Sequence, residues 1–461
     1  MSFPATTHET HLAPGGIPGL GHALRMRRDP LALFESLRPY GDVVRIKLGP
    51  QQVYVVTSTA VSTELFVSKY RSFDKGVAVE HFRSVFGSGL LSSDGETHRA
   101  DRLLMQPAFH RDRLADYVEL MREQVVEHTA TWRDGDVLDA RAALTAITLG
   151  VVTRAMISAK VGDELAAEIQ LRLPRILDLS YRRAMNPLPL LNRLPLPHNR
   201  EFADLVARLH PRIDAVIADY HRAETTKPDL LSMMLTARDE SSGASMADDR
   251  IHDQVMTILL AGSETAATAL SWIFLLLDGH PEVATRLLAE LHEVLGERPV
   301  RAADLPRLTY TTQVVDESLR HSPPIWLITR RATEDVSLGG YLVPRGASVM
   351  LSPYLTGHDP TLIEDPDTFD PDRWAADRVT QPLRLAALPF GAGPRKCIGD
   401  SFAVVEAIVA IATILPRWRV RRQPGNTITK TAGLTYFPAG LRLTVEARDR
   451  EPATPNSGSV G

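Results

Sequence analysis

The 461-residue sequence contains a single cysteine, Cys397, in the stretch LPFGAGPRKCIGDSFA near its end. Two glycines and a proline shape a tight turn before it, and apolar residues at helical spacing follow it. At the start of a helix, backbone N–H groups and the helix dipole stabilise a thiolate, and Arg395 and Lys396 favour the same charge. Cys397 is therefore a candidate functional thiolate. The alternatives are an inert buried cysteine and a hydrolase nucleophile, which requires a partner histidine that no motif identifies.

A second group that could take part in chemistry is the acid–hydroxyl pair Glu264 and Thr265, in the stretch AGSETAA. Adjacent acid and hydroxyl groups can pass protons to a reacting centre. The small residues Ala261 and Gly262 let a flat cofactor approach this helix, and Thr265 can bend it by hydrogen-bonding to its own backbone. The alternative is a polar pair that is satisfied within a core helix.

The sequence predicts both helices and strands as the elements that position these groups. Residues 42–58 alternate between apolar and polar like a β-hairpin, and residues 96–324 have mostly helical periodicity. Short β-like runs and irregular coil follow, then a helix after Cys397 and strands near the C-terminus. We expect a mostly α-helical protein with a small β-rich part and no clean boundary between the two.

The composition is that of an ordinary globular protein, with 44% hydrophobic and 23% charged residues and a formal net charge of −4. The sequence has no excess of basic residues that would indicate nucleic-acid binding. A lone cysteine excludes an intramolecular disulfide and any metal site that needs several cysteines. The polar, Pro/Ser/Gly-rich ends predict disorder in residues 1–15 and 448–461, which leaves one domain over residues 16–447.

The apolar stretch from Val255 to Leu277 is long enough to span a bilayer. However, Glu264 lies in its middle, where a carboxylate is costly, and Asp253 and Asp278 flank it instead of cations. We therefore expect a buried core helix in a cytoplasmic, monomeric protein without a transmembrane anchor or a signal peptide.

The cysteine turn resembles the haem-binding loop of the cytochrome P-450 superfamily. That loop reads Phe-Gly-x-Gly-x-Arg-x-Cys-x-Gly and is matched here by Phe390, Gly391, Gly393, Arg395, Cys397 and Gly399. The resemblance implies the P-450 fold, with haem b held between a long central helix and this loop. It also implies that the Cys397 thiolate is the axial ligand of the iron, which favours O–O bond cleavage.

The AGSET stretch resembles the superfamily's Ala-Gly-x-Glu-Thr element, in which the acid and the threonine deliver protons during oxygen activation. The usual second threonine or serine is Ala266 here. Glu317 and Arg320, three residues apart on one helix face, resemble the superfamily's Glu-x-x-Arg pair. A later arginine, Arg373, would complete a buried triad that braces the haem loop.

The resemblance also implies cations for the two haem propionates. His98 and Arg102 are four residues apart and point the same way from a helix. Arg330 and Arg395 come from two other segments, so that four donors match two carboxylates. The alternative for His98 and Arg102 alone is a solvated basic face.

The implied activity is that of a haem-thiolate monooxygenase, which uses O₂ and NAD(P)H-derived electrons to insert one oxygen atom into an organic substrate. Electrons would come from a ferredoxin and its reductase. The ferredoxin would dock on the Cys397 side, near Arg99, Arg395 and Lys396. The alternative from another class, a haem-thiolate gas sensor, would not need Glu264 and Thr265.

The family fold implies a substrate pocket that is mostly apolar, which favours a cyclic terpene, a sesquiterpene above all, over a fatty acid or a polyketide. Residues 14–50 are also similar to bacterial members that oxidise cyclic terpenes. Arg83 is the cation that could intrude and bind a carboxylate instead. The residues expected to line the pocket are Val77, Val79, Phe82, Val85, Phe86, Leu260, Ala261, Ile325, Trp326, Leu327, Ile328 and Leu434.

Overall fold

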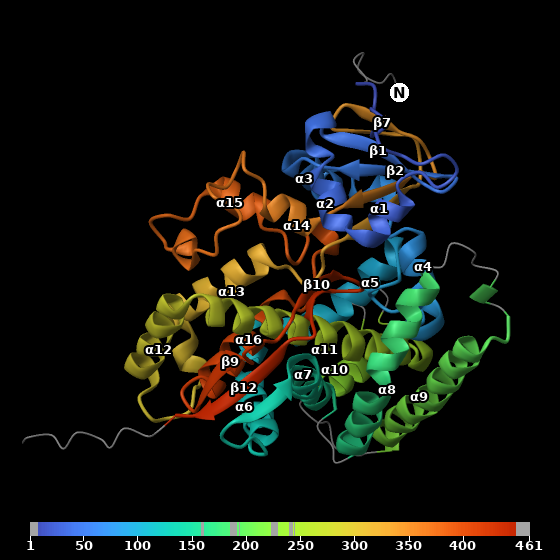
Figure 1. Cartoon of the computed structure of the whole chain (residues 1–461). Helices are drawn as coiled ribbons and strands as arrows, with labels where there is room; N and C mark the ends of the chain where they lie inside the picture. The colour runs from blue at the N-terminus through green and yellow to red at the C-terminus, as the bar shows by residue number, and fades with distance from the viewer. Residues whose placement is uncertain are drawn as a thin grey trace, which may run out of the picture.

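The structure is a computed structural model, and it describes residues 8–157, 161–184, 191–192, 194–222, 229–238, 243 and 245–448. A large helical body lies beside a smaller part built around a β-sheet (Figure 1). The prediction of a mostly α-helical protein with a small β-rich part is confirmed. The expected tail 448–461 lies outside the described residues apart from Arg448.

The α-helices are α1 Ala23–Arg28, α2 Pro30–Glu35, α3 Thr59–Val67, α4 Val77–Phe86, α5 Gly95–Met105, α6 Arg111–Thr129, α7 Ala140–Met156, α8 Val161–Ala184, α9 Pro197–Arg222, α10 Leu230–Thr236, α11 Asp248–Gly279, α12 Pro281–Leu295, α13 Thr309–His321, α14 Pro353–Gly357, α15 Gln381–Ala386 and α16 Asp400–Ile414. The strands are β1 Val43–Leu48, β2 Gln51–Val56, β3 Phe73–Asp74, β4 Asp136–Asp139, β5 Ile328–Ala332, β6 Val336–Leu338, β7 Tyr341–Val343, β8 Ser348–Leu351, β9 Trp418–Arg422, β10 Thr429–Ala432, β11 Tyr436–Ala439 and β12 Arg442–Ala447.

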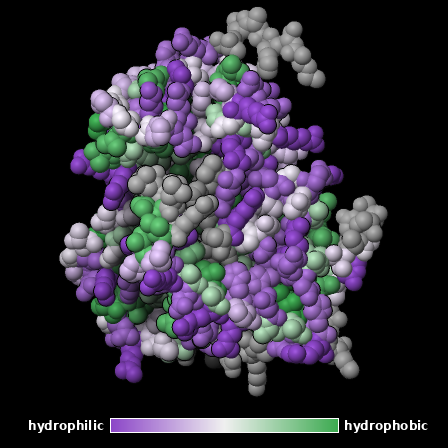
Figure 2. Space-filling model, turned by 90° about the vertical axis from the view of Figure 1, so that its right-hand side faces the viewer, coloured by the Kyte–Doolittle hydropathy of each residue, from purple (hydrophilic) through white to green (hydrophobic). Residues whose placement is uncertain are grey.

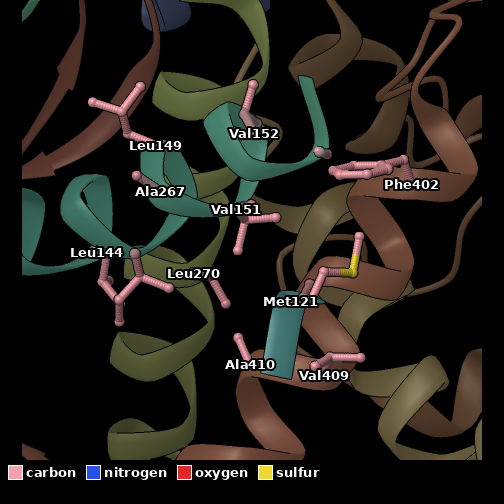
Figure 3. Packing of buried hydrophobic residues seen from close by; sticks show 14 of the residues in the cluster. Met121, Leu144, Leu149, Val151, Val152, Ala267, Leu270, Phe402, Val409 and Ala410 are labelled. Carbon is pink, nitrogen blue, oxygen red and sulfur yellow. The ribbon is translucent and has the colours of Figure 1, made fainter. Parts of the chain in front are cut away.

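The helical body is organised around α11, which crosses it and packs against α7, α13 and α16 (Figure 1). Leu270 of α11, Val151 of α7, Val409 of α16 and Met121 of α6 meet in one core, which Figure 3 shows from close by. Among the described residues, α11 is the one helix long and apolar enough to cross a membrane. However, 67% of its apolar window is buried inside the protein, as expected for a core helix.

The β-rich part contains a five-stranded sheet in the order β1-β2-β8-β5-β3. β1 and β2 form the hairpin that the sequence predicted, with Val43 opposite Val56. β2 pairs in parallel with β8, so chain segments almost 300 residues apart share this sheet. The face in Figure 2 carries mostly hydrophilic side chains, and its hydrophobic ones gather in small separate patches.

The disorder expected for residues 1–15 does not extend to residues 8–13. The His8 N–H donates to the Gly340 carbonyl at 2.9 Å, and the Ala13 N–H donates to the Arg45 carbonyl at 2.8 Å. Ala13 is also buried. The segment is ordered because it adds main-chain hydrogen bonds to the β6–β7 hairpin and to β1, which its polar composition does not reveal.

Candidate active site

The turn that carries Cys397 is closed by its own backbone. The Cys397 N–H donates to the Phe390 carbonyl at 2.9 Å, and the Lys396 N–H donates to the Gly393 carbonyl at 3.0 Å. The helix that follows begins only at Asp400. Cys397 therefore lies before the first helical turn, further from the positive end of the dipole than the sequence suggested.

The thiol of Cys397 is recessed among protein atoms but keeps solvent-accessible surface. Burial raises its pKa, and this outweighs the hydrogen bond from the Gly399 N–H and the charges of Arg102 and Lys396, which lower it. A neutral thiol is thus favoured by the protein alone, and a metal cation in contact with sulfur would reverse this preference.

Gly393 shows why the turn needs glycine. Its φ is +67°, and a β-carbon there would lie 2.2 Å from the Phe66 carbonyl oxygen. This close approach presses the turn against α3. Gly391 also has positive φ, whereas a β-carbon on Gly399 would make only an ordinary contact with Phe109.

A cation cluster of five basic side chains lies beside the turn, and four of them were predicted: His98, Arg102, Arg330 and Arg395. The fifth, Lys75, was missed. Burial, followed by the charges of Lys75, Arg395, Arg102 and Arg330, lowers the pKa of His98 to about 3. Burial likewise lowers the pKa of Lys75 to about 7, and Asp94 only partly opposes this. Burial thus disfavours the charged forms of these basic groups, and a bound ligand with two acidic groups would stabilise them.

The partners of these basic groups show how tightly the cation cluster is built. Arg395 contacts Asp94 at 2.9 Å and donates to the Phe73 carbonyl at 2.7 Å. The buried Lys75 donates from Nζ to the Leu90 carbonyl at 2.5 Å. Lys75 follows β3 directly in the stretch FDKG, a position for which the sequence offered no periodic or motif signal.

Glu264 and Thr265 are neighbours in sequence, but their side chains have different partners. The Thr265 hydroxyl donates to the Ala261 carbonyl at 2.6 Å, the backbone interaction that the sequence suggested. The buried Glu264 instead accepts from Arg141 of α7 at 2.6 Å. Ala261 remains exposed although α11 is largely buried around it.

Gly262 does not serve the purpose expected from the sequence. A β-carbon there would lie 2.8 Å from Cγ2 of Val152, so Gly262 permits close packing between α11 and α7. Ala261, one residue earlier and about 100° around the helix, is the small residue that leaves open surface.

The members of the predicted triad lie together, with Glu317 and Arg320 buried and Arg373 half-buried. Arg320 donates to both carboxylate oxygens of Glu317 at 2.8 Å, and Arg373 lies 3.4 Å from the same carboxylate. Arg320 also donates to the carbonyls of Gly357 and Pro366. The triad thus braces the coil that leads towards the cysteine turn, since these contacts lie in that coil and not in the turn itself.

The residues expected to line a substrate pocket separate into several groups. Phe82 and Phe86 stack with ring centroids 5.8 Å apart. Arg83 donates to the Ser92 carbonyl at 2.8 Å. Leu260 is buried in the main core, while Val79, Ile325, Leu327, Ile328 and Leu434 are half-buried. The side chains of Val77 and Val85 lie outside the described residues.

Trp326 departs from this expectation. It is buried in a separate core with Phe34, and its indole N–H donates to the Gly433 carbonyl at 2.8 Å. Trp326 therefore fixes residues 325–328 against the turn that carries Leu434. Its position in the family fold implied a pocket wall, but its long-range partners give it a bracing position.

The chain matches the family model described as "Cytochrome P450" over residues 13–441. It is 43% identical to cyclooctatin synthase of Streptomyces melanosporofaciens over 96% of this chain and 97% of that protein. It is 40% identical to pentalenene oxygenase of Streptomyces avermitilis, over 95% and 97% of the two chains. The cyclooctat-9-en-7-ol 5-monooxygenase of S. melanosporofaciens is 37% identical over 96% and 97%.

Two solved structures have a similar fold. The crystal structure of the cytochrome P450DA haem domain superposes with a TM-score of 0.87 at 25% identity, covering 96% of this chain and 99% of that one. The retinoic acid-bound cyanobacterial CYP120A1 superposes with a TM-score of 0.85 at 23% identity, covering 96% and 100%.

Proposed function

The chain belongs to the cytochrome P450 family, and from that premise we propose that its substrate is a cyclic terpene, with a sesquiterpene favoured. The protein is a haem-thiolate monooxygenase. When bound, the haem activates O₂ with externally supplied electrons, so that one oxygen atom enters the substrate and the other leaves as water. The chain's own residues hold the haem, bind the substrate and supply protons.

The cysteine turn and the cation cluster fit this group. Cys397 would supply the thiolate ligand, since its thiol is recessed, accessible and held in a rigid turn. Burial disfavours the charged forms of Lys75, His98 and Arg330, and two propionates beside them would stabilise those charged forms. The hydroxyl of Thr265, beside the exposed Ala261, would hold and pass a proton, and Glu264 would supply it.

The terpene proposal rests chiefly on the relatives. Pentalenene oxygenase and cyclooctat-9-en-7-ol 5-monooxygenase carry the names of cyclic terpene skeletons and match this chain over at least 95% of its length. Arg83, the cation that could anchor a carboxylate instead, donates from Nε and Nη2 to the Ser92 carbonyl. Burying about 300–400 Å² of hydrocarbon is worth roughly 8–10 kcal/mol before association costs.

Spectral titration tests the proposal. A ligand that displaces water from the haem iron shifts the spin state, so a cyclic sesquiterpene, a cyclic diterpene, a long-chain fatty acid and a macrolactone can be ranked by their Kd. We expect a cyclic terpene to bind most tightly, and Arg83→Ala to leave that affinity unchanged. Tightest binding of the fatty acid, lost in Arg83→Ala, would overturn the proposal in favour of carboxylate recognition.

A ferredoxin would dock beside the cysteine turn. Arg395 does not contribute as expected from the sequence, because it is largely buried and bound to Asp94. Arg99 and Lys396 remain exposed. They lie near a depression of about 560 Å³ that includes Leu103, 57% exposed, and Arg113. This mixture of cationic and apolar surface suits an acidic partner.

The docking site has its own test. Arg99→Glu and Leu103→Asp should raise the KM for ferredoxin while the Kd of the substrate stays constant. Arg182→Glu, an exposed arginine on α8, serves as the control. Unchanged ferredoxin kinetics in both variants would place the partner on another face.

A further inference from the structure

The carboxylate of Glu264 is held by two segments remote from it in sequence. Arg141, at the start of α7, contacts Oε1 at 2.6 Å, and the Thr435 hydroxyl donates to the same oxygen at 3.3 Å. The side chain of Glu264 is 5% exposed, whereas that of Arg141 is 45% exposed. The guanidinium therefore links a buried acid to solvent.

Thr435 belongs to a short chain of hydroxyl groups. The Thr268 hydroxyl, one turn after Glu264 on α11, donates to Oγ1 of Thr435 at 3.2 Å. The hydroxyls of Thr268 and Thr435 thus donate in sequence towards the carboxylate of Glu264, and each hydrogen bond polarises the next. These distances are long for hydroxyl hydrogen bonds, whose usual length is about 2.7–2.8 Å. The shorter, charged contact with Arg141 is therefore the principal anchor, and Thr435 is the weaker second one.

Both partners are held by β11 and the turn before it. The indole of Trp272 donates to the Tyr436 carbonyl at 2.7 Å, and the Tyr436 N–H donates to the Pro324 carbonyl at 2.8 Å. The guanidinium of Arg141 lies 4.3 Å from the ring centroid of Phe437. The same turn carries Leu434, so it joins the expected substrate pocket to the acid.

We propose that Arg141 and Thr435 are positioning residues for Glu264. Arg141 holds the buried carboxylate by a charge-assisted contact and connects it to solvent, and Thr435 aligns it through a second, longer hydrogen bond. The family motif places a second hydroxyl at position 266, where this chain has alanine. The hydroxyls of Thr268 and Thr435 supply this polar contact from other positions. The inference rests on the proposed role of Glu264 in proton delivery.

The test compares Arg141→Met and Thr435→Val with their conservative counterparts Arg141→Lys and Thr435→Ser. Arg286→Met is the matched control, because Arg286 also binds a carboxylate, Asp372 at 2.8 Å, and covers an aromatic ring, Tyr310 at 3.9 Å. Two quantities are measured: the product formed per NAD(P)H consumed, and the infrared band of a protonated carboxyl group, assigned by its loss on adding Glu264→Gln.

Loss of one charge-assisted hydrogen bond predicts that Arg141→Met lowers product per NAD(P)H by about 10- to 100-fold. A neutral carboxyl band should appear as well, because a buried acid without its cation holds its proton. Thr435→Val should lower coupling about 2- to 10-fold, and Thr435→Ser and Arg141→Lys should restore much of each loss. Arg286→Met should behave like the wild type.

The outcomes separate this inference from the role on which it rests. If Glu264→Gln retains coupling, the proposed role of Glu264 itself is wrong. If Glu264→Gln uncouples the enzyme while Arg141→Met and Thr435→Val do not, only the positioning inference is overturned. Should Arg141→Met fail to fold, the Thr435→Val and Thr435→Ser pair decides, because equal coupling in both would exclude a function for the hydroxyl.

Discussion

Glu317 and Arg320 form a bidentate ion pair, with both contacts at 2.8 Å and both side chains 0% exposed. The carboxylate of Glu317 also accepts from the Asp370 N–H and the Trp374 indole at 3.0 Å. Both carboxylate oxygens that burial removes from water thus find donors within the protein, which is the condition under which a buried ion pair is tolerated.

Removing one member of this pair should be costly. Glu317→Gln leaves Arg320 buried without its counter-charge, and we expect a loss of about 3–5 kcal/mol in unfolding free energy. Arg286→Met breaks an ion pair whose side chains are 54% and 37% exposed, and it should cost at most about 1 kcal/mol. Urea unfolding measures both. Equal, small losses in the two variants would mean that Glu317 and Arg320 are not a structural unit.

Cys397→Ala should remove the thiolate ligand proposed for the haem. The recessed turn around residue 397 would remain closed by its backbone, so the protein should still fold, as circular dichroism would show. The carbon monoxide difference spectrum should lose its thiolate-type band, and monooxygenation should be abolished. A variant that kept both would contradict the assignment of Cys397.

Thr265→Ala should affect proton delivery and leave folding intact, because the hydroxyl bonds only a carbonyl of its own helix among the described residues. The haem spectrum and substrate affinity should be retained, while reducing equivalents are diverted to peroxide. Proton-transfer steps of this kind are worth roughly 10²–10⁴-fold. Unchanged coupling between NAD(P)H use and product would make Thr265 merely structural.

Gly393→Ala should disrupt the cysteine turn. The positive φ of +67° and the 2.2 Å approach to the Phe66 carbonyl leave no room for a methyl group. We expect weakened haem retention, measured as the haem-to-protein absorbance ratio, and a lower Tm. Gly399→Ala is the matched control, since its nearest neighbour would be 3.8 Å away. Comparable haem retention in the two variants would contradict this account.

Stability should fall as the solution becomes acidic, partly because of the half-buried His321 and the buried His358. Burial, followed by the charges of neighbouring groups, lowers the pKa of His321 to about 3, and burial lowers that of His358 to about 4. The unfolded chain binds these protons below about pH 6.5 but the native protein does not. The stabilisation is therefore complete above pH 6.5 and declines down to the folded pKa values.

Each histidine contributes up to about 1.4 kcal/mol per pH unit within that window. Unfolding free energies of wild type and His358→Gln, measured between pH 7 and pH 5, isolate one contribution. The variant should show the shallower decline, because glutamine does not titrate. Parallel curves would mean that His358 titrates alike in the folded and unfolded protein.

The sequence by itself determined the features that depend on neighbouring residues. The hairpin of β1 and β2, the helix α11 and the turn around Cys397 each follow from local periodicity or from glycine and proline placement. The family motif extends this to Glu317 and Arg320, because their three-residue spacing already places them on one helix face.

Only the tertiary structure decided which partners the polar groups take. Arg141 is 123 residues from Glu264, and Thr435 is 171 residues from it. Lys75 joins the cation cluster because β3 pairs with β5, the strand that carries Arg330. Trp326 braces a turn more than 100 residues later in the chain. Such contacts arise from packing between remote segments, where burial requires each polar atom to find a donor or acceptor, and no local pattern encodes which one it finds.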